Sequence, residues 1–335
     1  MITTTVGSYP KVAERTYGTK LIGTITRWQR KELNDAELER TCQEITKAVI
    51  QEQERARLDL VTDGQIRWED LVTPIARRLD GFEINGLSRW FNNNVYYRRP
   101  ILHRAPKWTK PILVEEYRWA AQCTKRPVKA VLPGPYTFMK VSEDRYYKND
   151  RKFALTMAEL LNREAHALAK AGAPIIQFDE PALGYALPSS HGRARKGVTR
   201  REAPDVKLAV EALNVATKGI TAKTAVCTYF GSLDGGFEAL QRARVDVVGV
   251  DVVSDPAMLG VLKRVKITKE LALGCLDARN TKLESVGELH ALFNVVTKRV
   301  PADRLYVSPN CGLEFLPHES VLKKLSLLEQ VATQL

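Results

Sequence analysis

Two cysteines and two carboxylates stand where short apolar segments of this 335-residue chain give way to turns. Cys227 ends the run "KTAVC", and Cys311 follows the strand-like "LYVSPN". Asp251 and Asp277 take the same kind of position in "VDVVGVDVV" and "LALGCLDAR". Thiolate sulfur and carboxylate oxygen are zinc ligands, and a catalytic zinc keeps one of its four positions open. These residue types indicate a metal centre, provided that the fold brings them together.

A free cysteine is also often an inert, buried small hydrophobe. That interpretation fits Cys42 on an amphipathic stretch, Cys123, and Cys275 inside its apolar run. Cys227 and Cys311 differ because both lie at the end of an apolar segment, and for this pair both interpretations stay open. Five single, scattered cysteines do not form the pattern of a disulfide framework.

The elements that must position these residues are eight short apolar or β-branched segments, each ending in a polar or glycine-bearing turn. They span residues 3–10, 58–65, 128–137, 174–182, 223–231, 245–253, 271–279 and 305–312. Amphipathic stretches with helical spacing lie between them. Alternating strands and helices pair in parallel, and eight such units close a barrel. The sequence predicts an α/β fold, a single (β/α)8 TIM barrel over residues 1–335, with a doubly wound open sheet as the alternative.

In such a barrel the C-terminal ends of the strands share the face on which active sites are built. The segment ends place on that face Ser8, Asp63, Gly134, Asp179, Glu180, Cys227, Asp251, Asp277 and Cys311. The second unit is longer than one crossover needs, and its aromatic and β-branched runs are broken by Gly, Asn and Pro. We therefore expect an inserted, lid-like segment after strand 2, at about residues 75–125.

Composition narrows the class of protein. No apolar run is long enough to span a membrane and no secretory signal opens the chain, so a cytoplasmic enzyme without a membrane partner is expected. The formal net charge of +12 comes from basic residues that are mixed with acidic ones, as on solvated helix faces. Nucleic acid is therefore not the expected partner, and an anionic small molecule or an acidic protein fits equally well.

Seven motifs carry a family resemblance: "TTTVGSYP", "VTDGQIRWEDLV", "LPGPYT", "QFDEPAL", "VCTYF", "GCLDARNTKLES" and "SPNCGLEFLP". In order and spacing the chain resembles the C-terminal catalytic barrel of the cobalamin-independent methionine synthases. The likeness covers essentially the whole chain and implies a short, core-type homologue without the family's additional N-terminal barrel. It implies a methyltransferase that methylates a small thiol, homocysteine giving methionine, with Zn²⁺ activating the thiol.

The resemblance also implies roles for individual residues. Val6 and Ser8 would meet the backbone groups of the amino-acid substrate, and Asp179 would pair with its ammonium group. Cys227 and Cys311 would be the two sulfur ligands of the zinc.

Four positions depart from the family pattern. Ala225 stands where a histidine ligand is expected, and Asp251 stands where the next ligand is a glutamate. Gln65 replaces an acidic residue that helps to hold the substrate ammonium, and Val141 replaces a tryptophan near the pterin site. The remaining ligand set is Cys227, Asp251 and Cys311, which is the number that a catalytic zinc requires.

Asp277 and Arg279 are the predicted catalytic residues, and Arg279 lies near the position of a histidine proposed as a proton donor in longer relatives of the family that the chain resembles. An arginine cannot act as a general acid at neutral pH, so Arg279 is expected to bind an anionic group or to pair with Asp277.

Three functions stay open on the sequence. The first is zinc-dependent methyl transfer to homocysteine, in which the methyl donor is methylfolate or another donor such as a methyl-corrinoid protein. The second is another thiol alkyltransferase or lyase on the same barrel, with the metal site altered or lost. The third is a non-catalytic or nucleic-acid-binding protein, which leaves the cysteines and carboxylates at the strand ends unexplained.

Overall fold

The structure is a computed structural model that describes residues 1–11, 18–91, 93, 95–185, 187–188, 201–233 and 235–334. The chain forms two compact units. Unit 1 comprises Met1–Arg67, Glu115–Lys129 and Ala272–Leu335, and unit 2 comprises Trp68–Val114 and Ala130–Leu271.

Seven strands form one sheet in the order β1-β12-β11-β10-β9-β6-β4. Their bounds are β1 Ile2–Thr3, β4 Ala130–Pro133, β6 Ile175–Asp179, β9 Lys223–Cys227, β10 Val247–Asp251, β11 Glu270–Leu276 and β12 Leu305–Pro309. β1 pairs with β12 in parallel, and so do the neighbours β4, β6, β9 and β10 of unit 2. Every residue of β4, β6, β10 and β12 is buried, as expected of parallel strands covered on both faces. Seven of the eight predicted segments therefore overlap strands of this sheet, the first of them only at Thr3.

The eighth segment, residues 58–65, was predicted as a strand but makes only single bridges. Thr4 bridges to Leu60, and Val61 bridges to Val128, both in parallel. Beyond Val61 the ladder stops because the side chain of Gln53 bonds both the N–H and the C=O of Thr62, each at 2.9 Å. A left-handed turn follows at once, with φ of +70° at Gly64 and +49° at the next residue.

The helices of unit 1 are α1 Gly18–Gln29, α2 Asp35–Arg55, α10 Val286–Val296 and α11 His318–Ala332, together with α4 Val114–Gln122 apart from its first residue. Two 3-10 turns, η2 Ala302–Arg304 and η3 Leu313–Phe315, complete it. Reciprocal capping boxes, in which the cap side chain and a glutamate three residues later each accept a backbone N–H, start α2 at Asn34 and α10 at Ser285.

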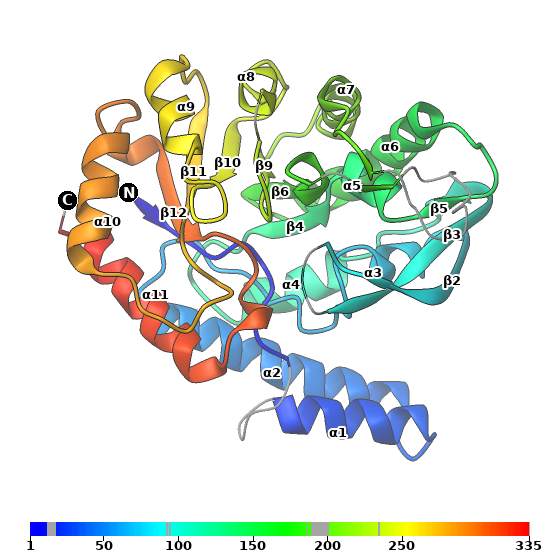
Figure 1. The fold of residues 1–335 in the computed structure, drawn as a ribbon. Helices are drawn as coiled ribbons and strands as arrows, with labels where there is room; N and C mark the ends of the chain where they lie inside the picture. The colour runs from blue at the N-terminus through cyan, green and yellow to red at the C-terminus, as the bar shows by residue number, and fades with distance from the viewer. Residues whose placement is uncertain are drawn as a thin grey trace. The chain divides into compact units, whose positions relative to one another are not determined.

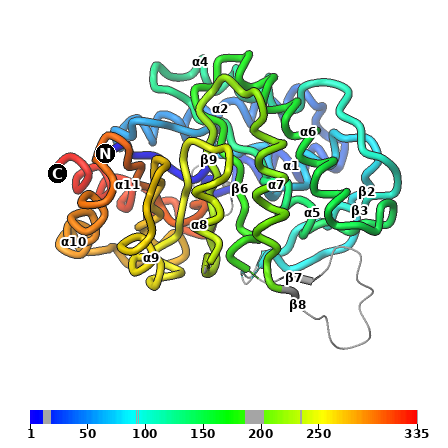
Figure 2. The backbone as a smooth tube through the Cα atoms, turned by 90° about the horizontal axis from the view of Figure 1, so that it is seen from above, coloured from blue at the N-terminus to red at the C-terminus, as the bar shows by residue number. Residues whose placement is uncertain are grey.

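The helices of unit 2 are α3 Thr73–Ala76, α5 Pro135–Lys140, α6 Asp150–Lys170, α7 Val206–Ala216, α8 Gly236–Leu240, α9 Met258–Arg264 and the 3-10 turn η1 Pro181–Leu183. Helices α6 to α9 lie in a row along the strands of this unit (Figure 1). Seen from above, they follow one another in chain order (Figure 2). This alternation of strand and crossover helix is the predicted α/β pattern.

The predicted insertion contains an antiparallel hairpin of β2 Asp80–Arg89 and β3 Tyr96–Lys107, whose second strand also pairs with β5 Glu143–Asp144. Phe82 of the hairpin packs its ring against Phe138 and Phe153, at centroid distances of 5.5 and 6.2 Å. The short strands β7 Leu187–Pro188 and β8 Arg201–Glu202 form a separate pair. Within the described ranges, no helix is both long and apolar enough to cross a membrane.

Candidate active site

Three neighbouring strands of unit 2 carry predicted site residues on one face. Asp179 of β6 and Gly249 of β10 are the register partners of Cys227 on β9, and Asp251 lies two residues beyond Gly249. Residues two apart on a strand point to the same face, so all three side chains share it. A Cβ at Gly249 would lie 2.6 Å from the Cys227 Sγ. The glycine therefore leaves the space that the thiol occupies.

Both carboxylate oxygens of Asp179 accept hydrogen bonds. Oδ1 accepts from Gln177 Nε2 at 2.6 Å, and Oδ2 accepts from the Tyr229 hydroxyl at 3.0 Å. These bonds fix the direction of a side chain that is only 3 % exposed. Neither donor was predicted from the sequence. Gln177 could have been found from the two-residue period of β6, whereas Tyr229 lies beyond the end of β9 and follows no such period.

Asp251 uses much of its bonding capacity on the backbone. Its Oδ1 accepts the N–H groups of Val253 and Ser254 at 2.9 and 2.8 Å, and its Oδ2 accepts the Phe230 N–H at 3.3 Å. These bonds tie the turn after β10 to the segment that follows β9.

The aromatic turn of the β2–β3 hairpin packs beside these strand ends. The ring of Phe91 lies 5.5 Å from that of Phe230 and 5.8 Å from that of Tyr185, and Phe230 packs 4.7 Å from Tyr229. Phe91 and Phe230 both have positive φ, at +51° and +74°. Such strained positions concentrate at functional sites. The hairpin is thus connected, through Phe230 and Tyr229, to the groups that hold Asp251 and Asp179.

Glu180 and Gly134, also predicted at strand ends, have a structural role in unit 2. The carboxylate of Glu180 accepts the N–H groups of Tyr136 and Thr137 at 3.0 and 2.6 Å, which fixes the start of α5. Burial raises the pKa of Glu180 to about 7. A Cβ at Gly134 would lie 2.1 Å from the Glu180 carboxyl carbon, so this close approach requires glycine.

In unit 1, the segment after β1 lies between two other strand-end segments. The Leu313 N–H donates to the Ser8 carbonyl at 2.9 Å, and the Tyr9 N–H donates to the Gly64 carbonyl at 3.0 Å. The Ser8 hydroxyl donates to Glu314 Oε2. Val6 is buried, and so is Cys311, which is 0 % exposed.

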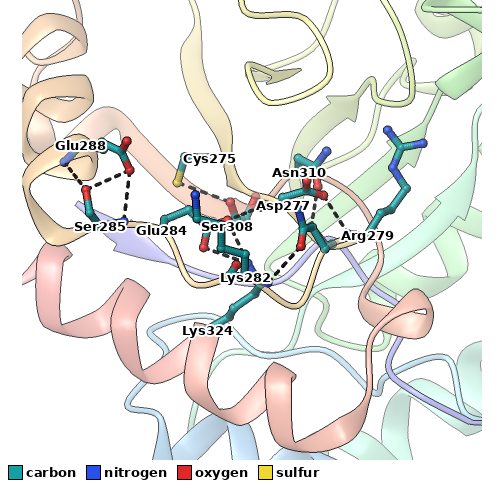
Figure 3. A network of polar contacts seen from close by, with 12 residues as sticks. Cys275, Asp277, Arg279, Lys282, Glu284, Ser285, Glu288, Ser308, Asn310 and Lys324 are labelled. Carbon is teal, nitrogen blue, oxygen red and sulfur yellow. Dashed lines mark hydrogen bonds and ion pairs between the residues drawn. The ribbon is translucent and has the colours of Figure 1, made fainter.

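Asn310, which directly precedes Cys311, ties that cysteine's loop to Asp277 and Arg279. Its Oδ1 accepts the Ala278 N–H at 2.9 Å, and its own N–H donates to the Leu276 carbonyl at 2.8 Å. Asp277 Oδ1 accepts the backbone N–H of Arg279 at 2.9 Å (Figure 3). This bond uses the arginine's main chain, and the expected pairing of its side chain with Asp277 stays a prediction.

Cys42 and Cys275 have the environment of inert thiols. Burial raises the pKa of Cys42 to about 11 and that of Cys275 to about 12, so both stay protonated at neutral pH. The Cys275 thiol contacts the Ser308 carbonyl at 3.5 Å (Figure 3).

A part-buried ion pair supports the Asp277 loop. The Nζ of Lys324, a fully buried side chain of α11, donates to both carboxylate oxygens of Glu284 at 2.8 Å and to the Lys282 carbonyl at 2.6 Å. Glu284 Oε1 also accepts the Asp277 N–H at 2.8 Å. Figure 3 shows Lys324 and Glu284 within this network.

Replacing Lys324 by methionine is expected to lower the free energy of unfolding by about 3 kcal/mol, because it leaves Glu284 without its buried counter-ion. Urea denaturation measures the change. Lys323→Met is the matched control, since that neighbouring lysine forms an exposed i,i+4 pair with Glu319. The control is expected to change stability by less than about 0.5 kcal/mol. Equal losses in the two variants would contradict a specific role for the part-buried pair.

The structure therefore assembles the predicted site residues within each unit. Asp179, Cys227 and Asp251 share one face of unit 2. In unit 1, hydrogen bonds connect the strand-end segments that carry Ser8, Asp277, Arg279 and Cys311. Among the residues that the structure describes, no group of three His, Cys, Asp or Glu side chains is arranged as a metal site. Two thiols and one carboxylate are nevertheless donor types that zinc binds.

Comparisons with known proteins agree with one another. The family model "Cobalamin-independent synthase, Catalytic domain" matches residues 1–334. A methionine synthase of Saccharolobus solfataricus is 29% identical over 325 residues, covering 96% of this chain and 91% of that protein. A methionine synthase of Saccharolobus islandicus is 30% identical with the same coverage. The structure of a B12-independent methionine synthase from Shewanella sp. W3-18-1, in complex with selenomethionine, matches with a TM-score of 0.82 at 23% identity, over 99% of this chain and 96% of that one. At that identity, the structural match establishes the fold.

Proposed function

This chain belongs to the cobalamin-independent methionine synthase family and is a methyltransferase, and we propose that it transfers a methyl group to the thiol of homocysteine to give methionine. The observation that carries the proposal is the pairing of Asp179 and Cys227 as register partners on neighbouring strands. A carboxylate for an ammonium group and a sulfur ligand then stand side by side at the strand ends.

Zinc is the proposed cofactor, with Cys227, Asp251 and Cys311 as its ligands. Support comes from the donor types, whereas Ala225 supplies no fourth protein ligand. When bound, the metal would lower the pKa of the substrate thiol so that a thiolate is present at neutral pH. Two thiolates and one carboxylate contribute about −3, which favours an electron-rich bound sulfur.

The chain's own residues bind and orient the reactants. Asp179, directed by Gln177 and Tyr229, pairs with the ammonium group, while Val6 and Ser8 contact the backbone groups of the amino acid. In the reaction the thiol sulfur bonds to the methyl carbon, the bond from that carbon to the donor breaks with its electron pair, and the thiol proton is released. Arg279, on the loop fixed by Asn310, binds an anionic group of a reactant.

We also propose that the barrel is closed and that the hairpin acts as its lid. Leu60 and Val61 are bridged to Thr4 on one side and to Val128 on the other, as the eighth strand position of a (β/α)8 barrel requires. The contact of Phe91 with Phe230 supports a lid beside the site. The single-domain organisation over residues 1–335 and the cytoplasmic location stay predictions from the sequence.

The methyl donor is proposed to differ from methylfolate, because Val141 replaces the tryptophan expected near the pterin. A methyl-corrinoid protein is the alternative donor. Ala225 and Gln65 favour a second candidate function, alkyl transfer to another small thiol or a lyase reaction on the same barrel.

Rescue of a methionine auxotroph that lacks its own methionine synthases tests the proposal. The chain is expected to restore growth on homocysteine when a suitable methyl donor is present, whereas an equally expressed Cys311→Ser variant is not. Failure of the wild-type chain with every donor supplied would favour the second candidate.

A further inference from the structure

Ser8, expected to contact the substrate directly, already has an internal partner in unit 1. Its hydroxyl donates to the carboxylate of Glu314, three residues after Cys311. Gly312 lies tightly against this pair, since a Cβ there would be 2.0 Å from Ser8 Oγ and 2.1 Å from Glu314 Oε2. The hydrogen bond from Ser8 and the close approach of Gly312 together fix the carboxylate of Glu314 at the strand ends. No carboxylate was predicted at this position.

Gln65, on the neighbouring strand-end segment, has an unsatisfied donor. Its side-chain Nε2 is buried and has no hydrogen-bond partner, and the residue as a whole is only 6 % exposed. Its backbone is held in the left-handed region, with φ of +49°, by a bond from its N–H to Asp63 Oδ1 at 2.9 Å. An unpaired buried amide is costly, so native proteins satisfy it with water or with a ligand acceptor.

The backbone holds these two groups on adjoining segments of unit 1. The residues flanking Ser8 are bonded on both sides: Thr62 Oγ1 donates to the Gly7 carbonyl at 2.9 Å, and Tyr9 donates to Gly64. On the other side, Leu313 donates to Ser8 itself. Ser8 is thus the middle of three connected segments, with Gln65 on one flank and Glu314 on the other.

We propose that Glu314, oriented by Ser8, is a second carboxylate for the ammonium group of the thiol substrate, in addition to Asp179, and that the buried amide of Gln65 donates a hydrogen bond to the substrate's carboxylate. This inference rests on the proposed function and adds a specificity-determining pair to it. In this arrangement Gln65 does not take over the role of the acidic residue expected at position 65. Glu314 supplies that negative charge instead.

The negative charge of Glu314 favours this assignment of the ammonium and carboxylate groups of the substrate. A substrate carboxylate at Ser8 would meet the negative charge of Glu314, which is unfavourable at short range in a site shielded from water. Desolvation raises the pKa of Glu314, against the opposing effects of the Ser8 hydrogen bond and the Lys11 charge. A carboxylate that is poorly solvated gains most from an incoming cation.

Three thiols separate the two contacts experimentally. Homocysteine carries both charged groups, 4-sulfanylbutanoate lacks the ammonium, and 3-sulfanylpropylamine lacks the carboxylate. KM for homocysteine, with saturating donor, and inhibition constants for the two analogues are measured for wild type, Glu314→Gln, Glu314→Asp, Gln65→Glu and Gln65→Met. Glu319→Gln, which neutralises an exposed glutamate of unit 1, is the matched control.

Glu314→Gln is expected to raise KM for homocysteine by about 10- to 100-fold with kcat nearly unchanged, and to leave binding of 4-sulfanylbutanoate unaffected. Glu314→Asp keeps the charge and is expected to recover part of the loss. Gln65→Glu and Gln65→Met are both expected to weaken homocysteine and 4-sulfanylbutanoate, and to spare 3-sulfanylpropylamine.

Tighter homocysteine binding by Gln65→Glu would overturn the inference, because position 65 would then face the ammonium. An unchanged KM for homocysteine in Glu314→Gln would also overturn the inference. Unchanged KM and inhibition constants in both Gln65 variants would overturn it as well, because the Gln65 amide would then be satisfied by an internal water. Absence of any homocysteine turnover or binding by the wild-type protein would instead remove the proposed function and this inference with it.

Discussion

Replacing Cys311 by serine is expected to lower kcat/KM for thiol methylation by about 10³-fold and to remove most of the bound zinc. A metal-bound thiolate supplies several kcal/mol of charge stabilisation, and each 1.36 kcal/mol corresponds to a tenfold change in rate. Serine is almost isosteric with cysteine but is a poor zinc ligand, so the loss reports on the sulfur rather than on packing. Metal analysis of protein purified without a His-tag, alongside steady-state kinetics, measures both effects.

Cys123→Ser is the matched control, because Cys123 is a free, partly exposed cysteine of the same unit. It is expected to leave zinc content and kcat/KM within about twofold of wild type. An active, metal-free wild-type protein would contradict the zinc assignment. A Cys311→Ser protein that keeps its zinc would contradict the role of Cys311.

Asp179→Asn is the second substitution with a large expected effect. Asparagine fits the same space and can keep the bond from Gln177, but it removes the buried negative charge. A hydrogen bond to a charged group is worth about 1.5–3 kcal/mol, which corresponds to a rise in KM for homocysteine of about 10- to 150-fold. Initial-rate measurements over a wide range of homocysteine concentration give KM and kcat separately.

Tyr229→Phe is the comparison for that substitution, because it removes one donor to Asp179 and keeps the carboxylate. It is expected to raise KM by less than about tenfold, since only a single bond is lost. Equal effects of the two substitutions would show that the position of the side chain matters and its charge does not. An unchanged KM in Asp179→Asn would place the ammonium elsewhere.

Most of the fold was predictable because burial leaves a clear trace in the sequence. The strands β4, β6, β10 and β12 are buried throughout, and their apolar runs are therefore nearly continuous. Residues 58–65 look equally apolar at their start, yet side-chain bonds from Gln53 to Thr62 end the ladder after single bridges. Such competition from a distant side chain has no local sequence signal.

The candidate site was predictable in part for the same reason. Strand ends could be located, and so Asp179, Cys227, Asp251 and Cys311 could be named. The hydrogen bonds from Tyr229 to Asp179 and from Ser8 to Glu314 join residues 50 and 306 positions apart, and no local period connects them. The role of Glu180 as the residue that fixes the start of α5 likewise emerged only from its two bonds to the backbone of that helix.

Transfer of an isotope-labelled methyl group tests the central claim most directly. The purified, zinc-loaded protein is incubated with homocysteine and a ¹³CH₃-labelled donor, either methylfolate or a methyl-corrinoid, and methionine is detected by mass spectrometry. The proposed function predicts methionine labelled at its S-methyl group, formed with at least one donor and absent with the Cys311→Ser protein. Methionine that never carries the label, or equal labelling with the Cys311→Ser protein, would contradict it.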